Sequence, residues 1–368
     1  MTVNRKIYLV RHGEIVHDKD EKVCLGCRSD PPLSERGIRQ AEALGEWFRE
    51  RGVSEVYSSP LRRCDSTARI IAEKASAAGP YTEDDLREVD TGEWDGLTFS
   101  EIRERYPSDY ASRGRDIFGY PPPGGESFAG ALERFSRCVS VLTSVIKGDA
   151  VIVAHAGVIR AFICALSGRD PGELFSIPQP YAGITTLVYG VPQEGGLSLR
   201  ILSPGYRPDS LLDREETERL YRMFETPSGV IDHMEAVAEY AGKLADELGG
   251  NFDRERLVKA ALVHDIARTK KRHAEAGADA LEREGFYDIA RLVRVHQSPE
   301  ATDEEKLSEE DILFYADKRF SGTRFVTVRQ RFDESLEKCR TEEALKNHQM
   351  MLEKTLLIEK KISGYLDK

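Results

Sequence analysis

The chain has 368 residues, a formal net charge of −11 and 40% hydrophobic residues, the composition of an ordinary globular protein. Its length leaves room for two domains of about 100–200 residues each. The acidic balance argues against a broad nucleic-acid surface, and no apolar run approaches the roughly 20 residues that cross a bilayer. No apolar core of a signal peptide follows the N-terminus, so we expect a cytoplasmic protein without a membrane or nucleic-acid partner.

The first half of the chain alternates strand-like and helix-like patterns. Residues 6–10 form an apolar run that stops at Arg11-His12-Gly13, and residues 150–154 form another that stops at His155. The other expected elements are a helix capped by Ser34 that runs through 41–48, helices over 67–71 and 159–166, strands over 53–57, 185–191 and 197–202, and a turn at 194–196. This order predicts an α/β domain with a mostly parallel sheet flanked by helices.

Polar side chains follow three of the expected strands. Arg11-His12, Ser58-Ser59 and His155 each stand just after an apolar run. Because ligands of open α/β sheets bind outside the carboxyl ends of the strands, we expect these residues to share one site.

The pattern changes at a stretch over 203–209 that contains proline and glycine, and we expect domains at 1–205 and 206–368. Beyond it, apolar residues recur at helical spacing and no strand pattern remains. These stripes cover 230–248, 255–267, 287–296, 308–320 and 334–363. The second half is therefore predicted to be all-helical.

Six motifs in the first half occur in a fixed order. They are Arg11-His12-Gly13-Glu14 and the groups within 26–37, 58–68, 88–96, 123–127 and 155–160. The series over 5–203 resembles the histidine phosphatase family, which has the phosphoglycerate-mutase-like fold. Gly92-Glu93-Trp94-Asp95-Gly96 and Pro123-Gly124-Gly125-Glu126-Ser127 look most like its α-ribazole phosphatase branch.

A neutral imidazole can attack phosphorus and form a phosphohistidine that water later hydrolyses. Guanidinium groups match phosphate oxygens, and the leaving alkoxide needs a proton. The resemblance implies that His12 is phosphorylated, that Arg11, Arg62 and His155 form the phosphate pocket, and that Glu88 donates the proton. It implies no metal or other cofactor in this domain.

Two positions depart from the family pattern. His17 and Asp18 stand where the family often has Trp-Asn, and contact with substrate and a solvated loop both remain open for them. Glu88 and His155 are 67 positions apart, which resembles the compact phosphatases rather than the mutases. We expect the segments 103–122 and 170–183 to line the pocket. Cys24 and Cys27 form a lone CxxC, for which reduced thiols are favoured over zinc.

Histidines and aspartates recur on the helices of the second half. His264 follows Leu257 and Ala261 by seven and three positions, so it lies on or beside the buried face of its helix, and His296 has the same spacing in its own stripe. Buried imidazoles and carboxylates need partners, and a metal ion would satisfy several together.

The order His…His-Asp…His…His…Asp over 225–335 resembles the HD superfamily of metal-dependent phosphohydrolases. The resemblance implies a minimal ligand set of His233, His264, Asp265 and Asp317, with Asp265 as the bridging ligand. The additional His273 and His296 resemble the subgroup that holds two ions, some members of which cleave nucleotides. Mixed histidine and aspartate ligands suit one or two divalent ions of Fe, Mn, Mg or Zn.

Basic residues stand close to this series. They are Arg268, Lys270, Lys271, Lys318 and Arg319, which either hold substrate phosphates or form a solvated rim. The sequence therefore predicts a bifunctional phosphohydrolase with a metal-free histidine phosphatase site and a metal-dependent HD site. The alternative is an active phosphatase with a non-catalytic, nucleotide-sensing HD domain. The expected partner is a phosphorylated small molecule, with a nucleotide as one candidate, and the oligomeric state stays open.

Overall fold

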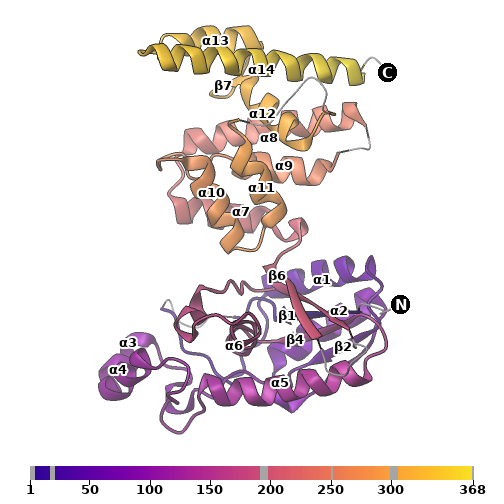
Figure 1. Ribbon diagram of the computed structural model, residues 1–368, viewed down its shortest axis with the longest axis vertical. Helices are drawn as coiled ribbons and strands as arrows, with labels where there is room; N and C mark the ends of the chain where they lie inside the picture. Colours follow the sequence, from indigo (N-terminus) through magenta and orange to yellow (C-terminus); the bar gives the residue numbers. More distant parts are fainter. Residues whose placement is uncertain (1–4, 17–20, 191–197, 250–251, 299–305, 367–368) are drawn as a thin grey trace. The chain divides into compact units, whose positions relative to one another are not determined.

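A computed structural model describes residues 5–16, 21–190, 198–249, 252–298 and 306–366 (Figure 1). Contacts divide the chain into two compact units, residues 1–208 and 209–368. The assignment of 1–205 and 206–368 as separate domains stays a prediction.

The first unit is built on a six-stranded sheet with the order β3-β2-β4-β1-β5-β6. Its strands are β1 (Arg5–Arg11), β2 (Glu55–Ser58), β3 (Ala78–Thr82), β4 (Ala150–Ala154), β5 (Ile184–Gly190) and β6 (Ser198–Tyr206). The first four pair in parallel, whereas β5 and β6 are antiparallel. The predicted α/β fold with a mostly parallel sheet is confirmed.

Helices cover both faces of this sheet (Figure 1). They are α1 (Glu35–Arg49) and α2 (Arg62–Ala75) on one face, and α5 (Phe128–Val145) and α6 (Ala156–Leu166) on the other. Successive side chains of a strand point to opposite faces, so Tyr8 of β1 packs edge-on against Phe48 of α1, while Ile7 faces α5 and α6. As expected, Ser34 caps α1 and accepts a hydrogen bond from the Gly37 amide.

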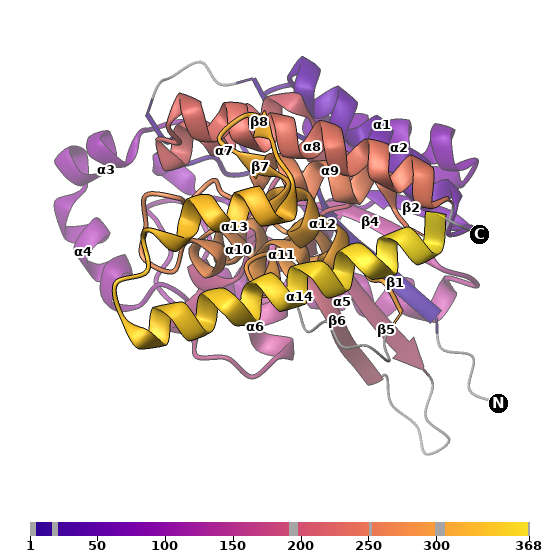
Figure 2. The same cartoon turned by 90° about the horizontal axis from the view of Figure 1, so that it is seen from above.

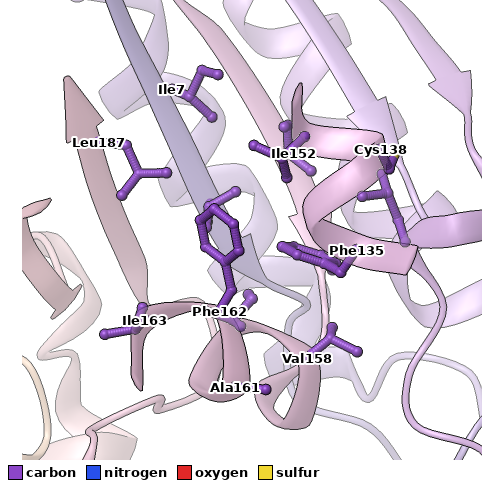
Figure 3. Close-up of a cluster of buried hydrophobic side chains, with 14 of the residues drawn as sticks. Ile7, Phe135, Cys138, Ile152, Val158, Ala161, Phe162, Ile163 and Leu187 are labelled. Atoms are coloured by element: carbon purple, nitrogen blue, oxygen red, sulfur yellow. The ribbon is translucent and has the colours of Figure 1, made fainter. Parts of the chain in front are cut away.

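The core between the sheet and the second helix pair is apolar and fully buried. Ile7, Ile152 and Leu187 come from three neighbouring strands and meet the rings of Phe135 and Phe162 (Figure 3). The two rings pack edge to face with centroids 5.5 Å apart. This layer fixes α6 against the sheet, and with it the residues at the start of α6.

The first unit departs from the predicted elements at two places. β3 was not expected, because the Ala78-Gly79-Pro80 sequence reads as a turn. β6 runs to Tyr206, so the stretch over 203–209 begins as strand rather than as linker. The turn expected at 194–196 lies outside the described residues. Helices α3 (Phe99–Arg105) and α4 (Pro107–Arg115) form most of the segment expected to line the pocket.

The second unit is mostly helical. Its helices are α7 (Arg214–Phe224), α8 (Ser228–Leu248), α9 (Arg254–Val263), α10 (His273–Arg283), α11 (Tyr287–Val295), α12 (Glu309–Lys318), α13 (Val328–Leu336) and α14 (Glu342–Leu366). The second unit departs from the all-helical prediction in one short hairpin. Its two strands, β7 (Phe320–Ser321) and β8 (Arg324–Phe325), have two residues each. The stripe expected over 334–363 is split between α13 and α14, which pack side by side (Figure 2).

Among the described residues, no helix combines the length and the apolar character that crossing a bilayer requires. All six cysteines are free, including Cys24 and Cys27.

We expect Phe135→Ala to lower the free energy of unfolding of the first unit by about 3–5 kcal/mol, because a fully buried ring is replaced by a cavity. Both tryptophans, Trp47 and Trp94, lie in this unit, so their fluorescence during urea unfolding reports on it alone. Val141→Ala on the same helix is the control, because Val141 is 58% exposed. A loss in Phe135→Ala no larger than in this control would contradict the packing described.

Candidate functional sites

The register of the parallel strands brings three polar strand ends together. Arg11 pairs with Ala154 and Ser58 pairs with Val153, so the next residue of each strand emerges at the same edge of the sheet. His12 and His155 meet there with ring centroids 5.3 Å apart, and the His155 Nε2 lies 2.8 Å from the Ser59 Oγ. The structure thus gathers the strand-end residues that the sequence singles out.

The ring of His12 is fixed by its own backbone. Its Nδ1 lies 2.8 Å from the Gly13 carbonyl oxygen, and because a carbonyl only accepts, Nδ1 carries the proton and Nε2 the lone pair. Burial, followed by the charges of Arg11 and Arg63, holds the pKa of His12 well below its usual value. His12 is therefore a neutral imidazole with a free nucleophilic nitrogen.

Arg63, not Arg62, faces the two histidines. Arg62 is the first residue of α2 and its side chain is exposed. Arg63 is buried, donates to the carbonyl groups of Ser29 (2.7 Å) and Gly26 (3.0 Å), and lowers the pKa of His155 after the larger effect of burial. The prediction of Arg62 as a pocket residue is wrong by one position, because each helical residue turns by about 100° and only the second points inward.

Arg11 is held by the segment 170–183, which is predicted only as a wall of the pocket. Its Nη1 donates to the Gln179 carbonyl oxygen at 2.6 Å, and its guanidinium lies 3.7 Å from the centroid of the Tyr181 ring. That ring is also 5.7 Å from the His12 ring, centroid to centroid. The segment 170–183 therefore reaches the site, and Tyr181 is a site residue that no sequence motif indicates.

Glu88 is held by the first turn of α6. Its carboxylate accepts hydrogen bonds from the backbone amides of Gly157 (2.9 Å), Val158 (3.1 Å) and Val89 (2.9 Å). A Cβ at position 157 would lie 2.5 Å from the Glu88 Oε1, so only glycine allows this approach. The carboxylate is thereby fixed two residues beyond His155, at the same sheet edge.

Two expected features of this site remain without a structural account. His17 and Asp18 lie outside the described residues. In the segment 103–122, the Arg113 guanidinium lies 5.0 Å from the Phe128 ring centroid, and a role for this segment as pocket wall stays a prediction.

The second unit brings its histidines and aspartates to the ends of four helices. His233 of α8 lies 3.1 Å from Asp317 of α12, measured from Nε2 to Oδ1. The Nε2 of His264 is 3.8 Å from an oxygen of Asp265 and 3.8 Å from Asp317. The Nε2 of His296, just after α11, lies 3.5 Å from the Asp265 Oδ1.

Backbone carbonyl groups turn three of these rings the same way. The Nδ1 atoms of His264, His296 and His233 lie 2.8, 2.6 and 2.8 Å from carbonyl oxygens, so each Nε2 is turned toward the carboxylates and carries a lone pair when the ring is neutral. Acceptor atoms thus face acceptor atoms, and the buried His264 Nε2 and Asp265 Oδ1 have no hydrogen-bond partner. Converging lone pairs without a donor fit a cation.

The ligand atoms form two groups that share His264. One group is His233, His264 and Asp317, and the other is His264, Asp265 and His296, each with its ligand atoms within 4.8 Å of one another. The two oxygens of Asp265 serve different neighbours, since Oδ2 faces His264 and Oδ1 faces His296. Asp265 belongs to only one of the two groups, so its role as a bridging ligand stays a prediction.

His273 differs from the other histidines. Its Nε2 lies 3.1 Å from the Asp265 Oδ1, but the side chains of Arg268 and Gln297 donate to the same nitrogen. It is therefore outside both ligand groups, and its role as a ligand stays a prediction.

The protonation states of His264 and Asp317 are those of metal ligands. Burial lowers the pKa of His264 to about 4, so its ring is neutral at pH 7. Burial raises the pKa of the Asp317 carboxyl. The charge of Lys318, followed by the hydrogen bond from His233, outweighs burial and holds this pKa well below its usual value. His264 and Asp317 are therefore in the forms that bind metal ions. His233 differs, because its hydrogen bond to Asp317 outweighs burial and raises its pKa, so binding of a metal ion there would displace that proton.

Comparison with known families supports both halves of this description. Residues 7–199 match the histidine phosphatase superfamily (branch 1), and residues 230–320 match the HD domain. A protein of Mycobacterium tuberculosis named as bifunctional is 32% identical over 200 residues, which are 54% of this chain and 53% of that protein. The chain therefore spans about half the length of this relative. The name of the relative gives no information about the second unit of this chain.

Two other relatives are matched over most of their own length. A 2,3-bisphosphoglycerate-dependent phosphoglycerate mutase of Methylorubrum populi is 33% identical over 48% of this chain and 85% of the relative. Phosphoserine phosphatase 1 of Hydrogenobacter thermophilus is 36% identical over 46% and 80%. Relatives named as a mutase and as a phosphatase thus both match the chain, and the preference for phosphatases drawn from the spacing between Glu88 and His155 stays a prediction.

Solved structures also resemble the chain over about half its length. The mycobacterial glucosyl-3-phosphoglycerate phosphatase gives a TM-score of 0.48 at 27% identity, covering 54% of this chain and 97% of its own. The α-ribazole phosphatase of Shigella flexneri gives 0.47 at 24% identity, covering 54% and 95%. On the family match, the chain belongs to the histidine phosphatase superfamily (branch 1) and carries an HD domain after it.

Proposed function

We propose that the chain is a bifunctional phosphohydrolase whose first site hydrolyses phosphomonoesters through a phosphohistidine on His12. The observation that carries this proposal is the neutral, buried His12 ring, whose free Nε2 lies beside His155 and within the fields of Arg11 and Arg63. Negative charge on a transferring phosphoryl group requires such fixed cations around it.

The residues allow a balanced two-step reaction. The His12 Nε2 attacks phosphorus, a P–N bond forms, and the bond to the leaving oxygen breaks as Glu88 supplies a proton to it. Water then attacks the phosphohistidine, gives its proton to the Glu88 carboxylate, and the P–N bond breaks to release inorganic phosphate. Arg11 and Arg63 hold the phosphoryl oxygens in both steps, and His155 donates to them from the other side.

The second site is proposed to hold one or two divalent ions of Fe, Mn, Mg or Zn and to cleave a nucleotide-type phosphoester. His233, His264 and Asp317 would hold one ion, with Asp265 and His296 extending the set to a second. A bound ion supplies Lewis-acid activation of water at such a site. Arg268, which lies 3.4 Å from the Asp265 Oδ2, is placed to attract substrate phosphate.

The substrate of the first site is proposed to be a phosphorylated small molecule. Relatives named as a phosphatase and as a mutase share this first domain, and both kinds of reaction suit a phosphohistidine. They differ in whether water or an alcohol accepts the phosphoryl group. We favour water, and release of inorganic phosphate is the corresponding measurement.

We expect p-nitrophenyl phosphate labelled with ³²P to leave label on wild-type protein quenched in alkali, and none on His12→Ala. Alkaline quenching is needed because phosphohistidine is labile in acid. Equal labelling of both proteins would contradict the assignment of His12.

The variant Glu88→Gln tests whether Glu88 acts as the general acid. As general acid, Glu88 should matter for alkyl phosphates, where its removal should cost about 10²–10⁴-fold in rate. It should matter less for p-nitrophenyl phosphate, whose leaving group departs without a proton. An equal loss on both substrates would assign Glu88 a role other than proton donation.

Arg63→Met should weaken the binding of inorganic phosphate by about 10–100-fold, because charge-assisted hydrogen bonds to phosphate are lost. The adjacent Arg62→Met removes the same charge from an exposed position and is the matched control. Isothermal titration measures both. A loss in Arg62→Met equal to that in Arg63→Met would contradict the orientation of α2.

For the second site, we expect metal analysis of the purified full chain to find a divalent ion that Asp265→Ala has lost, wholly or in part. We also expect a nucleotide phosphohydrolase activity that chelator and Asp265→Ala abolish while His12 labelling continues. If Asp265→Ala changes only the kinetics of the first site, the regulatory alternative holds and the second catalytic function is contradicted.

A further inference from the structure

The hairpin β7–β8 contacts a proposed metal ligand, although it begins where the segment that matches the HD domain ends. The carbonyl oxygen of Gly322, at the turn of the hairpin, lies 2.8 Å from the His233 Nδ1. The other nitrogen of the same ring, Nε2, lies 3.1 Å from the Asp317 Oδ1. His233 is thus held between two acceptors, one on each side of its ring.

These two acceptors favour opposite forms of the ring. A neutral imidazole carries one proton, and carbonyl and carboxylate oxygens can only accept it. The Gly322 carbonyl requires that proton on Nδ1, which leaves the Nε2 lone pair for a metal ion. The Asp317 carboxylate requires the proton on Nε2, and this hydrogen bond would withdraw both side chains from the ligand set. The position of the Gly322 carbonyl therefore decides which form His233 adopts.

The side chain of Arg319 holds the hairpin at its base. Its Nε donates to the Val326 carbonyl oxygen at 2.8 Å, and the Val326 amide donates back to the Arg319 carbonyl oxygen at 2.8 Å. Its Nη1 donates to the Tyr315 hydroxyl of α12 at 2.6 Å. The guanidinium also lies 4.3 Å from the Phe325 ring centroid. The ammonium group of a lysine lacks this planar fork of donors and could not make the same contacts together.

These contacts fix the hairpin against α8 and α12, the helices that carry His233 and Asp317. β7 contacts both helices (Figure 1). The Phe325 ring packs edge-on against Tyr240 with centroids 5.0 Å apart, and the Arg319 Nη1 lies 3.4 Å from the Tyr240 hydroxyl. Tyr240 stands about two turns beyond His233 on the same helix. The turn of the hairpin is therefore fixed relative to both ligands.

We propose that Arg319 is a positioning residue of the second site, which keeps the His233 Nε2 free for a divalent ion by fixing the Gly322 carbonyl. The proposal rests on the metal-dependent function proposed for this site. The role differs from the two that the sequence leaves open for Arg319, a phosphate contact and a solvated rim. It accounts for the direction of the side chain, whose donors point to Val326 and Tyr315.

A purely structural role for Arg319 makes a different prediction. If Arg319 only stabilised the fold, its loss would lower the free energy of unfolding and leave the proton of His233 on Nδ1. If Arg319 positions the Gly322 carbonyl, the proton moves to Nε2 when Arg319 is lost, because water accepts from either nitrogen and only the Asp317 carboxylate then selects between them. The tautomer of His233 in the metal-free protein is therefore the informative quantity.

Nitrogen NMR of the metal-free full chain measures this tautomer. Long-range ¹H–¹⁵N spectra, at a pH where the ring is neutral, distinguish a protonated from an unprotonated ring nitrogen, and the signals that His233→Ala lacks belong to His233. We expect the proton on Nδ1 in wild type and on Nε2 in Arg319→Met. Arg329→Met removes the same charge from an exposed position of α13 and should give the wild-type spectrum.

Metal binding is the second measurement. Mn²⁺ titration of the same proteins, followed by the electron paramagnetic resonance of the free ion, should show about 10–100-fold weaker binding to Arg319→Met than to wild type and Arg329→Met. Gly322→Val should have the same two effects with the guanidinium intact. Its Cβ would lie in open space, but a β-branched residue disfavours the positive φ of 61° at this turn. This variant decides the question if Arg319→Met does not fold.

Each outcome bears on one of the two proposals. A wild-type proton on Nε2 overturns the positioning role, and so does a folded Arg319→Met or Gly322→Val that keeps the proton on Nδ1 or binds Mn²⁺ as tightly as wild type. If wild type binds neither Mn²⁺ nor Fe²⁺, Mg²⁺ or Zn²⁺, the metal site on which the positioning role rests is overturned instead.

Discussion

Hydrogen bonds from Nδ1 to backbone carbonyl groups determine which ring nitrogen the site histidines present. Gly13 accepts from His12 in the first unit, and Ala261 and Val293 accept from His264 and His296 in the second. The latter two histidines follow the last residues of α9 and α11, where helix carbonyls lack helical partners and are free to accept. One kind of contact therefore frees the Nε2 of the proposed nucleophile in one unit and the Nε2 atoms of the proposed metal ligands in the other.

What separates the two sites is the charge that each one lacks. The first site has buried arginines and neutral imidazoles, so its positive charge calls for an anion. The second has ionised aspartates beside imidazole lone pairs, so its acceptors call for a cation. The protein as a whole has a formal net charge of −11. This net charge predicts neither site, because the charge of each site depends on a few buried side chains.

Much of this arrangement follows from the sequence because parallel strands impose it. Apolar runs that stop at Arg11-His12 and at His155 mark strand ends, and parallel pairing sets those ends at one edge. In the second half, the spacing of His264 and His296 behind apolar positions places both on buried faces, where the structure has them. Periodicity and strand polarity are local properties, and a single sequence displays them.

Contacts between segments that are distant in sequence cannot be predicted from such local patterns. Tyr181 becomes a site residue only because β5 pairs antiparallel with β1 and carries the preceding loop to Arg11. His273 has the expected spacing, yet Arg268 and Gln297 occupy the nitrogen that a metal would need. No sequence motif predicts that Arg268 and Gln297 compete for the His273 nitrogen, or that the loop with Tyr181 reaches Arg11.

The pair Arg62 and Arg63 shows the limit most sharply. Both residues are arginines at the start of a helix, so composition and motif alike permit either one to face the phosphate. The choice depends on where α2 begins, and Thr67 marks the inward face because its Oγ1 accepts from the Gly13 amide at 3.1 Å. Arg63 lies one turn before Thr67, and the Thr67 hydroxyl donates to the Arg63 carbonyl oxygen at 2.7 Å. A contact between α2 and the His12 loop, rather than the chemistry of either arginine, therefore selects the arginine that points inward.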